Sequence, residues 1–394
     1  MDDNEKIKVY RGNTDFDYVD VNDLKKEISK YMQSDNLNFL LGAGCSSYRK
    51  NKKEFGIPIM SGLYDEFKEK YPNFSIGNKK IFQNSFFEKD LNYNLEMLME
   101  KLISLRDVKD YVNLDADAIN QNICTVKQFI NKKIKDINFG NSPVLDIYKE
   151  FYLRIVRKNK RNPINVATTN YDLFNEMALD NLGFYYNDGF SGTFERKFNP
   201  LTYGYIYANN MNLKNNTWDR VDNYFNLFKI HGSISWSKDN GQIYEKDPKS
   251  ITNNVMIYPT PLKDRSTLMI PYSDLFRSFE NQLSLPNSVL ITIGYSFGDD
   301  HINRIILNNL SSQDFRLIVL GDIGKNNSIL NDLLKNKDPR IIVINSDKKI
   351  HYFNNFVNKL MPDPLDDVKE KQLVKKISDN FANIIYNSGD RFEQ

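Results

Sequence analysis

Short apolar runs alternate with amphipathic segments from residue 164 onward, and this alternation constrains the fold more than any other feature. The apolar runs lie at 164–168, 289–293, 317–320 and 341–344. The segments between them carry apolar residues at helical spacing, at 173–182, near 299–310 and near 328–336. Runs that are apolar at nearly every position suit strands buried on both faces, and strands that alternate with helices form parallel sheets. The sequence therefore predicts an α/β fold, with a parallel sheet and helices on both of its faces.

The rest of the chain divides into segments around this pattern. We expect an N-terminal arm and helix over residues 1–37, in which residues 1–20 form either an arm or an edge element, followed by one large domain over 38–362. That domain begins with a buried strand at 38–41 and carries a mostly helical insertion at about 48–158. Residues 363–394 predict a C-terminal helix, because Leu373, Val374, Ile377, Phe381 and Ile384 recur at helical spacing.

Composition and charge exclude several classes of protein. With 53 Lys+Arg against 51 Asp+Glu, the net charge is +2, which argues against a generally basic coat for nucleic acid. The 2 cysteines exclude a four-cysteine zinc site, and the 3 histidines make a histidine-rich metal site improbable, so no metal is expected. No apolar run approaches the roughly 20 residues that span a bilayer, and the N-terminus lacks a signal-peptide pattern. We therefore expect a cytoplasmic protein that does not enter a membrane.

The first two predicted strands end in segments that could bind a nucleotide. In Gly42-Ala43-Gly44-Cys45-Ser46, small residues would let a phosphate approach the backbone N–H groups, and a following helix would add its dipole. Alternatively, the same small residues could serve only to let the chain turn tightly as it leaves the strand. In 168–172, the amide of Asn170 could bind a ribose hydroxyl or a water. Asn170 or Asp172 could equally be a helix cap.

Two later strands end in the same manner. The segment 229–233 contains His231, which could act as a general base or could be a packed structural histidine. The segment 293–303 places Gly294 and Ser296 at the sheet edge, and Asp299 or Asp300 could cap the helix that follows. All these segments lie at the carboxyl ends of strands, where open α/β sheets bind their ligands.

Taken in order, the patterns GAGxS, TxNYD, KIHGS and GYSFGDxHxN resemble the sirtuin superfamily. More narrowly, they resemble the sirtuin-like NAD-cleaving domains of bacterial antiphage defence systems. The resemblance covers roughly residues 38–322. It implies a Rossmann-like sheet that binds NAD⁺ as a substrate, without a prosthetic group.

The resemblance also implies roles for individual residues. Asn170 and His231 match the family's catalytic asparagine and histidine, and Asn170 also contacts the nucleotide. The implied NAD⁺-binding residues are Gly42, Ala43, Gly44 and Ser46 in the pyrophosphate loop, Gly294 and Ser296 in a second loop, and Asp322 near the adenosine ribose.

The chain departs from the protein-deacylating sirtuins in two places. It has no cysteine after His231, so it lacks the four-cysteine zinc ribbon of that group. The sirtuin segment Gly-Ile-Pro-Asp-Phe-Arg is also incomplete, because Gly56-Ile57-Pro58 continues as Ile59-Met60-Ser61. In sirtuins this segment helps to cover the nicotinamide ribose, so its loss is consistent with water as the acceptor.

The resemblance therefore implies an NAD⁺ glycohydrolase (NADase) that depletes NAD⁺ as an antiphage effector. It further implies regulation through a homo-oligomer and a HerA-type ring ATPase partner, with contact to DNA only through that complex. A non-catalytic nucleotide-binding subunit or a nuclease subunit of a defence complex is the alternative. The near-neutral charge and the lack of a carboxylate-rich metal motif weaken the nuclease form, and the missing zinc ribbon disfavours a protein deacylase.

Overall fold

The structure is a computed structural model of the 394-residue chain. The residues that it describes are 6–12, 14–50, 53–58, 60–77, 79–83, 85–91, 93–108, 115–156, 162–212, 217–251, 254–256, 270–321, 328–346 and 349–389.

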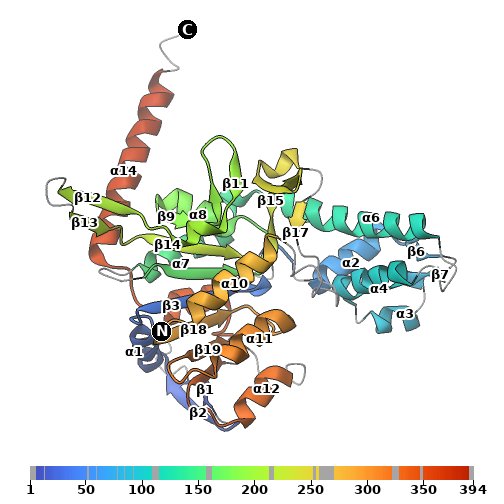
Figure 1. Cartoon of the computed structure of the whole chain (residues 1–394), viewed down its shortest axis with the longest axis horizontal. Helices are drawn as coiled ribbons and strands as arrows, with labels where there is room; N and C mark the ends of the chain where they lie inside the picture. Colours follow the sequence, from blue (N-terminus) through green and yellow to red (C-terminus); the bar gives the residue numbers. More distant parts are fainter. Residues whose placement is uncertain are drawn as a thin grey trace.

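A nine-stranded sheet forms the centre of the molecule (Figure 1). In spatial order its strands are β2 (Phe16–Asp20), β1 (Lys6–Arg11), β20 (Ile341–Asn345), β19 (Arg316–Leu320), β18 (Ser288–Ile293), β3 (Asn36–Leu41), β8 (Ile164–Thr168), β14 (Tyr224–Lys229) and β9 (Tyr185–Asn187). Every neighbouring pair from β20 to β9 is parallel, whereas β1 runs antiparallel to both of its neighbours. The predicted α/β class and the largely parallel sheet are confirmed.

The N-terminal segment forms an edge of the main sheet, which is one of the two alternatives that the sequence left open. Its residues form β1 and β2, and β1 pairs with β20, so this segment extends the sheet of the large domain. The pairing joins residues more than 300 positions apart, and local sequence patterns carry no information about such a contact. The expected helix is present as α1 (Val21–Tyr31).

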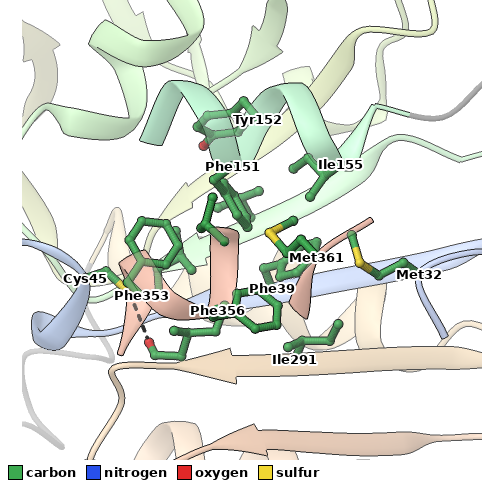
Figure 2. Packing of buried hydrophobic residues seen from close by; sticks show 14 of the residues in the cluster. Met32, Phe39, Cys45, Phe151, Tyr152, Ile155, Ile291, Phe353, Phe356 and Met361 are labelled. Carbon is green, nitrogen blue, oxygen red and sulfur yellow. Dashed lines mark hydrogen bonds between the residues drawn. The ribbon is translucent and has the colours of Figure 1, made fainter. Parts of the chain in front are cut away.

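Helices cover both faces of the sheet, as the strand alternation predicted. Side chains of β3 point alternately to the two sides: Phe39 and Leu41 join one buried cluster, and Leu40 joins the other. The first cluster receives α1, α7 (Pro143–Ile155), α8 (Phe174–Leu182), α13 (Phe353–Asn355) and the π-helical segment η6 (Phe356–Leu360). The second receives α10 (Tyr272–Leu283), α11 (Asp300–Asn309) and α12 (Ser328–Lys335). Figure 2 shows the first cluster, in which the ring of Phe151 packs against the rings of both Phe39 and Phe353.

Most of the helical insertion forms a subdomain with its own core. The insertion begins with the hairpin of β4 (Ser47–Lys50) and β5 (Lys53–Gly56), which packs against the main core through Tyr48 and Phe55. The subdomain consists of the hairpin of β6 (Ser75–Ile76) and β7 (Lys79–Lys80) and the helices α2 (Met60–Lys70), α3 (Ser85–Asp90), α4 (Leu95–Asp107) and α6 (Ala116–Lys135). Figure 1 shows these helices together on one side of the molecule. Their buried cluster also includes Tyr171 and Ile234 from the α/β domain, so the subdomain packs against that domain. The last helix of the insertion, α7, packs instead on the central sheet.

A second, smaller sheet is formed by strands that lie on both sides of β14 in the sequence. Its order is β10 (Phe190–Ser191), β11 (Arg196–Phe198), β16 (Gln242–Glu245), β15 (Gly232–Asp239) and β17 (Asn254–Met256). The hairpin of β12 (Ala208–Asn212) and β13 (Thr217–Arg220) lies between β11 and β14 in the sequence. The chain ends in the long helix α14 (Asp366–Gly389).

A ladder of buried asparagines crosses the centre of the main sheet. Asn226 donates to Asn165 at 2.9 Å, Asn165 donates to Asn38 at 2.8 Å, and Asn38 donates to Ser288 at 2.8 Å. These four residues belong to the adjacent strands β14, β8, β3 and β18, and all are fully buried. A buried polar group that loses its partner is costly, so a shift of one residue in register would break the ladder.

We expect Asn165→Ala to lower the free energy of unfolding by about 3 kcal/mol, because it leaves an Asn38 oxygen and an Asn226 N–H buried without partners. Chemical denaturation of the variant and the parent protein measures this difference. Asn308→Ala, at an exposed position on α11, is the matched control and should change stability by about 0.5 kcal/mol at most. Equal losses at the two positions would contradict a role for the ladder.

Candidate active site

Two loops meet at the carboxyl edge of the sheet, where the adjacent parallel strands β3 and β18 end. Gly42 N–H donates to Ile293 O at 2.9 Å, and Gly44 N–H donates to Gly294 O at 3.0 Å. A Cβ on Gly42 would lie 2.3 Å from Gly294 O, and Gly294 has a φ of +63°. Both loops therefore need glycine in order to approach one another.

The loop after β3 does not lead into an α-helix, contrary to one expectation from the sequence. Residues Ala43–Cys45 form one turn of 3-10 helix, and the β4–β5 hairpin follows. Cys45 turns away from the edge into the core below it (Figure 2), and its thiol donates to Ile293 O at 3.3 Å. Burial and the nearby Asp172 raise the pKa of the Cys45 thiol well above its ordinary value, so this group is a packed thiol.

A buried network connects this loop to the end of β8. Asn170 Nδ2 donates to Gly42 O at 2.9 Å and to Ser46 Oγ at 2.7 Å, while Ser46 Oγ donates to Asp172 Oδ2 at 2.5 Å. Asp172 Oδ1 accepts from the N–H of Phe174, the first residue of α8, while the N-cap position itself is Leu173. The hydroxyl of Ser46, which sequence reasoning assigned to the nucleotide, is thus used to hold Asn170 and Asp172 together.

A buried lysine supports the same segment from beneath. Lys229 Nζ contacts Glu176 Oε1 at 2.7 Å and also donates to the backbone carbonyl of Asp172. Burial raises the pKa of the Asp172 and Glu176 carboxyls, and the positive charge of Lys229 acts in the opposite direction. The lysine of the KIHGS pattern therefore holds the loop that carries Asn170.

His231 lies beside the second loop and forms a pair with Asp299. The two side chains are nearly fully buried, and His231 Nε2 lies 2.8 Å from Asp299 Oδ2. The other carboxylate oxygen of Asp299 accepts from the N–H groups of His301 and Ile302 at the start of α11. Asp299 is therefore both the helix cap considered from the sequence and the partner of His231.

The loop that carries Asp299 is itself braced. Asn303 Nδ2 donates to Phe297 O at 2.8 Å, and the hydroxyl of Tyr295 lies 3.0 Å from Asn303 Oδ1 and 3.2 Å from Asp299 O. These bonds fix the backbone from which the Asp299 side chain extends.

Together these segments line a cavity of about 500 Å³. From the α/β domain its lining residues are Ala43, Gly44, Ser46, Ile57, Pro58, Thr169, Asn170, Tyr171, Asp172, His231, Gly294, Tyr295, Ser296, Gly298 and Asp299. Four more come from the helical subdomain: Leu63, Asn94, Ile130 and Ile134. None of these four was predicted from the sequence. Ile130 and Ile134, for example, have the spacing of ordinary core residues on a helix.

The structure thus brings most of the predicted site residues to one cavity. Asn170, His231, Ala43, Gly44, Ser46, Gly294 and Ser296 all line it. Gly42 lies beside it and accepts a hydrogen bond from Asn170. Asp322 lies outside the described residues.

The cavity is lined by acidic side chains. Its ionisable lining residues include the carboxyls of Asp172 and Asp299, and its lining holds no lysine or arginine in the part of the chain that is described. No group of three or more His, Cys, Asp or Glu residues is placed to hold a metal ion among those same residues. None of the described helices is both long and apolar enough to cross a membrane.

Part of the chain matches the model of a known protein family. Residues 165–341 match the model of the SIR2-like domain. This match supports a Sir2-type domain and a Rossmann-like fold. SIR2-like domains use NAD⁺ as a substrate, so an NAD-related activity is indicated. The matched range contains Asn170, His231, Gly294 and Ser296, whereas the loop at 42–46 precedes it. A search of curated proteins found no match to the chain.

Proposed function

We propose that this protein is an NAD⁺ glycohydrolase, which uses water to cleave the bond between nicotinamide and ribose. The observation that carries the proposal is the convergence of Asn170 and His231 on one cavity, between the two loops at the sheet edge. The match to a SIR2-like domain supports NAD⁺ as the nucleotide.

The charge distribution suits this reaction. Cleavage of the N-glycosidic bond passes through a transition state that resembles an oxocarbenium ion, with positive charge on the ribose. A buried carboxylate near the cleavage point would stabilise that charge, and Asp299 is a nearly fully buried carboxyl in the cavity wall. Because the described lining lacks lysine and arginine, backbone N–H groups and Ser296 would bind the pyrophosphate.

Asn170 would position the reactants. Both hydrogens of its Nδ2 are used, one by Gly42 O and one by Ser46 Oγ. Its Oδ1 is therefore the atom that would accept a hydrogen bond from a ribose hydroxyl or from the attacking water. Because the amide is held at two points, the position of Oδ1 is fixed before the substrate binds.

His231 would act as the base. It would accept a proton from the water or from a ribose hydroxyl, with Asp299 holding the ring. The water oxygen bonds to the anomeric carbon, and the electron pair of the broken bond stays on the nicotinamide nitrogen. The products are nicotinamide and ADP-ribose, with one proton released to solvent.

Water is favoured over an acyl-lysine acceptor by the sequence. The chain has no zinc ribbon, since both of its cysteines precede His231.

By the resemblance to antiphage effectors, we further propose that the reaction depletes NAD⁺ during infection. A homo-oligomer and a HerA-type ring ATPase would then control the activity.

The proposal is tested by mixing the purified chain with NAD⁺, with and without a HerA-type ATPase, and measuring nicotinamide and ADP-ribose by chromatography. We expect equal amounts of the two products, no need for an acetyl-lysine peptide and no loss of activity with EDTA. Calorimetry with NAD⁺ provides a second readout. A chain that neither binds nor cleaves NAD⁺ under either condition would refute the proposal, and cleavage that requires the peptide would show a deacylase.

A further inference from the structure

Tyr148 of α7 lies beneath the candidate site, and the mechanism above does not use it. Its side chain is fully buried. The ring stacks on that of Phe174, with the two ring centres 5.6 Å apart and the planes 16° from parallel. Phe174 is the residue whose N–H donates to Asp172. Tyr148 therefore packs against the start of α8, beside the end of the segment that carries Asn170.

The same face of α7 also packs against the loop that follows β3. Val144 lies one turn before Tyr148 on this helix, and residues four apart share a helix face. A Cβ on Gly56 would lie 2.1 Å from Ser46 O and 2.9 Å from Val144 Cγ2, so Ser46 and Val144 both lie against Gly56. This face of α7 therefore reaches the loop of Ser46 as well as the start of α8.

The hydroxyl of Tyr148 is a buried polar group without a full hydrogen bond. No atom of the described residues meets it at hydrogen-bonding geometry. Burial raises the pKa of Tyr148 well above its ordinary value, and the charge of Asp172 adds to this effect, whereas the polar groups of Ser46 and Asn170 act in the opposite direction. Buried hydroxyls are rarely left without a partner, and hydrogen bonds in unliganded active sites often tighten only when the substrate is bound. The hydroxyl thus keeps its proton at neutral pH, beside the network of Asn170.

A count of hydrogens fixes the direction in which this bond can form. Asn170 Nδ2 gives one hydrogen to Gly42 O and the other to Ser46 Oγ. The Ser46 hydroxyl gives its only hydrogen to Asp172. Neither group has a hydrogen left for Tyr148, so Tyr148 is the donor. Ser46 Oγ and Asn170 Oδ1 each retain a lone pair that can accept its hydrogen.

We propose that Tyr148 is a positioning residue for the NAD⁺ reaction, whose hydroxyl donates to the Asn170–Ser46 pair when Asn170 engages the reacting groups. The inference rests on the proposed function, in which Asn170 Oδ1 orients the water or a ribose hydroxyl. Tyr148 does not line the cavity, so it acts through Asn170 and not on the substrate. A bond that is made in the transition state and not in the ground state raises turnover without raising affinity.

The test compares two conservative substitutions on one helix. Tyr148→Phe removes the hydroxyl beside Asn170. Tyr152→Phe, one turn further along α7, removes an equally buried hydroxyl that donates instead to Asn175 Oδ1 at 2.8 Å. We expect Tyr148→Phe to lower kcat for nicotinamide release about 10-fold, the scale of one hydrogen bond. Its Kd for NAD⁺, measured by calorimetry, and its unfolding temperature should stay close to those of the parent protein.

Tyr152→Phe should show the opposite pattern. It should keep the parent kcat and lower the unfolding temperature, because it leaves the buried Asn175 oxygen without its donor. A double-mutant cycle adds a third measurement. In the Asn170→Ala background, Tyr148→Phe should cause no further loss of kcat, since the effects of residues that act through one another do not add.

Three results would overturn the inference and leave the NAD⁺ reaction standing. They are a parent kcat in Tyr148→Phe, a further loss of about 10-fold when Tyr148→Phe is added to Asn170→Ala, and a loss of kcat that follows a fall in unfolding temperature. If the parent protein itself neither binds nor cleaves NAD⁺, the proposed function fails, and the role of Tyr148 fails with it.

Discussion

His231→Ala should lower the rate of nicotinamide release by about 1000-fold, within the range that a positioned general base contributes. Asn170→Ala should cause a comparable loss, because it removes the group that orients the water or the ribose hydroxyl. Both side chains line the same cavity, and each extends from the end of a central strand. Steady-state assays of product formation measure both effects, under the conditions in which the parent protein is active.

Controls distinguish loss of chemistry from loss of structure. His301→Ala removes another histidine, which lies on α11, packs against Phe276 of α10 and does not line the cavity. It should keep the parent rate. Asn170→Ala also removes two hydrogen bonds between loops, so its thermal unfolding and its affinity for NAD⁺ are measured alongside. If His231→Ala and Asn170→Ala both turn over NAD⁺ like the parent, the assigned site is wrong.

Asp299→Asn should lower the turnover number by at least 100-fold while leaving the affinity for NAD⁺ close to that of the parent. A carboxylate that orients a histidine and stabilises its protonated form contributes on this scale in other hydrolases. Asparagine is a good helix cap, so the variant should keep the start of α11 and its thermal stability. The comparison therefore separates the two roles of Asp299, which in the native protein share one side chain.

Two further variants complete this test. Asp299→Ala removes the cap as well as the partner of His231, so it should also lower the unfolding temperature. Asp300→Asn changes the adjacent, exposed aspartate and should affect neither quantity. Native turnover in Asp299→Asn would show that Asp299 serves only as a cap.

The main strands could be predicted because a strand that is buried on both faces is apolar at most of its consecutive positions. The runs at 289–293 and 164–168 are apolar or small at most positions, and both are fully buried in the central sheet. The small residues at their ends follow from the same geometry, since a chain that leaves a parallel sheet must turn sharply. The asparagines of β3, β8 and β14 interrupt this apolar pattern, and only the assembled sheet shows that they pair with one another.

Which residues lie at the sheet edge could be predicted from the sequence, whereas the contacts between their side chains could not. Asn170 and His231 were recognised from ordered motifs, yet the sequence left open whether Asp299 caps a helix or takes part in the site. In the structure Asp299 caps α11, and its Oδ2 lies 2.8 Å from His231 Nε2. The Ser46 hydroxyl, assigned to the nucleotide, is used to hold Asn170 and Asp172. Such assignments depend on distances between strand ends that are far apart in the sequence.

The sequence by itself determined the α/β class, the alternation of strands and helices, and the positions of the loops at the sheet edge, because each depends on the burial and conformation of neighbouring residues. Tertiary structure decided the rest. It decided that β1 joins the sheet beside β20, that helices α2 and α6 supply one wall of the cavity, and that Leu373, Val374 and Ile377 of α14 are exposed to solvent. These features arise from contacts between distant segments, whose free energy depends on the packing of the whole chain and leaves no local pattern.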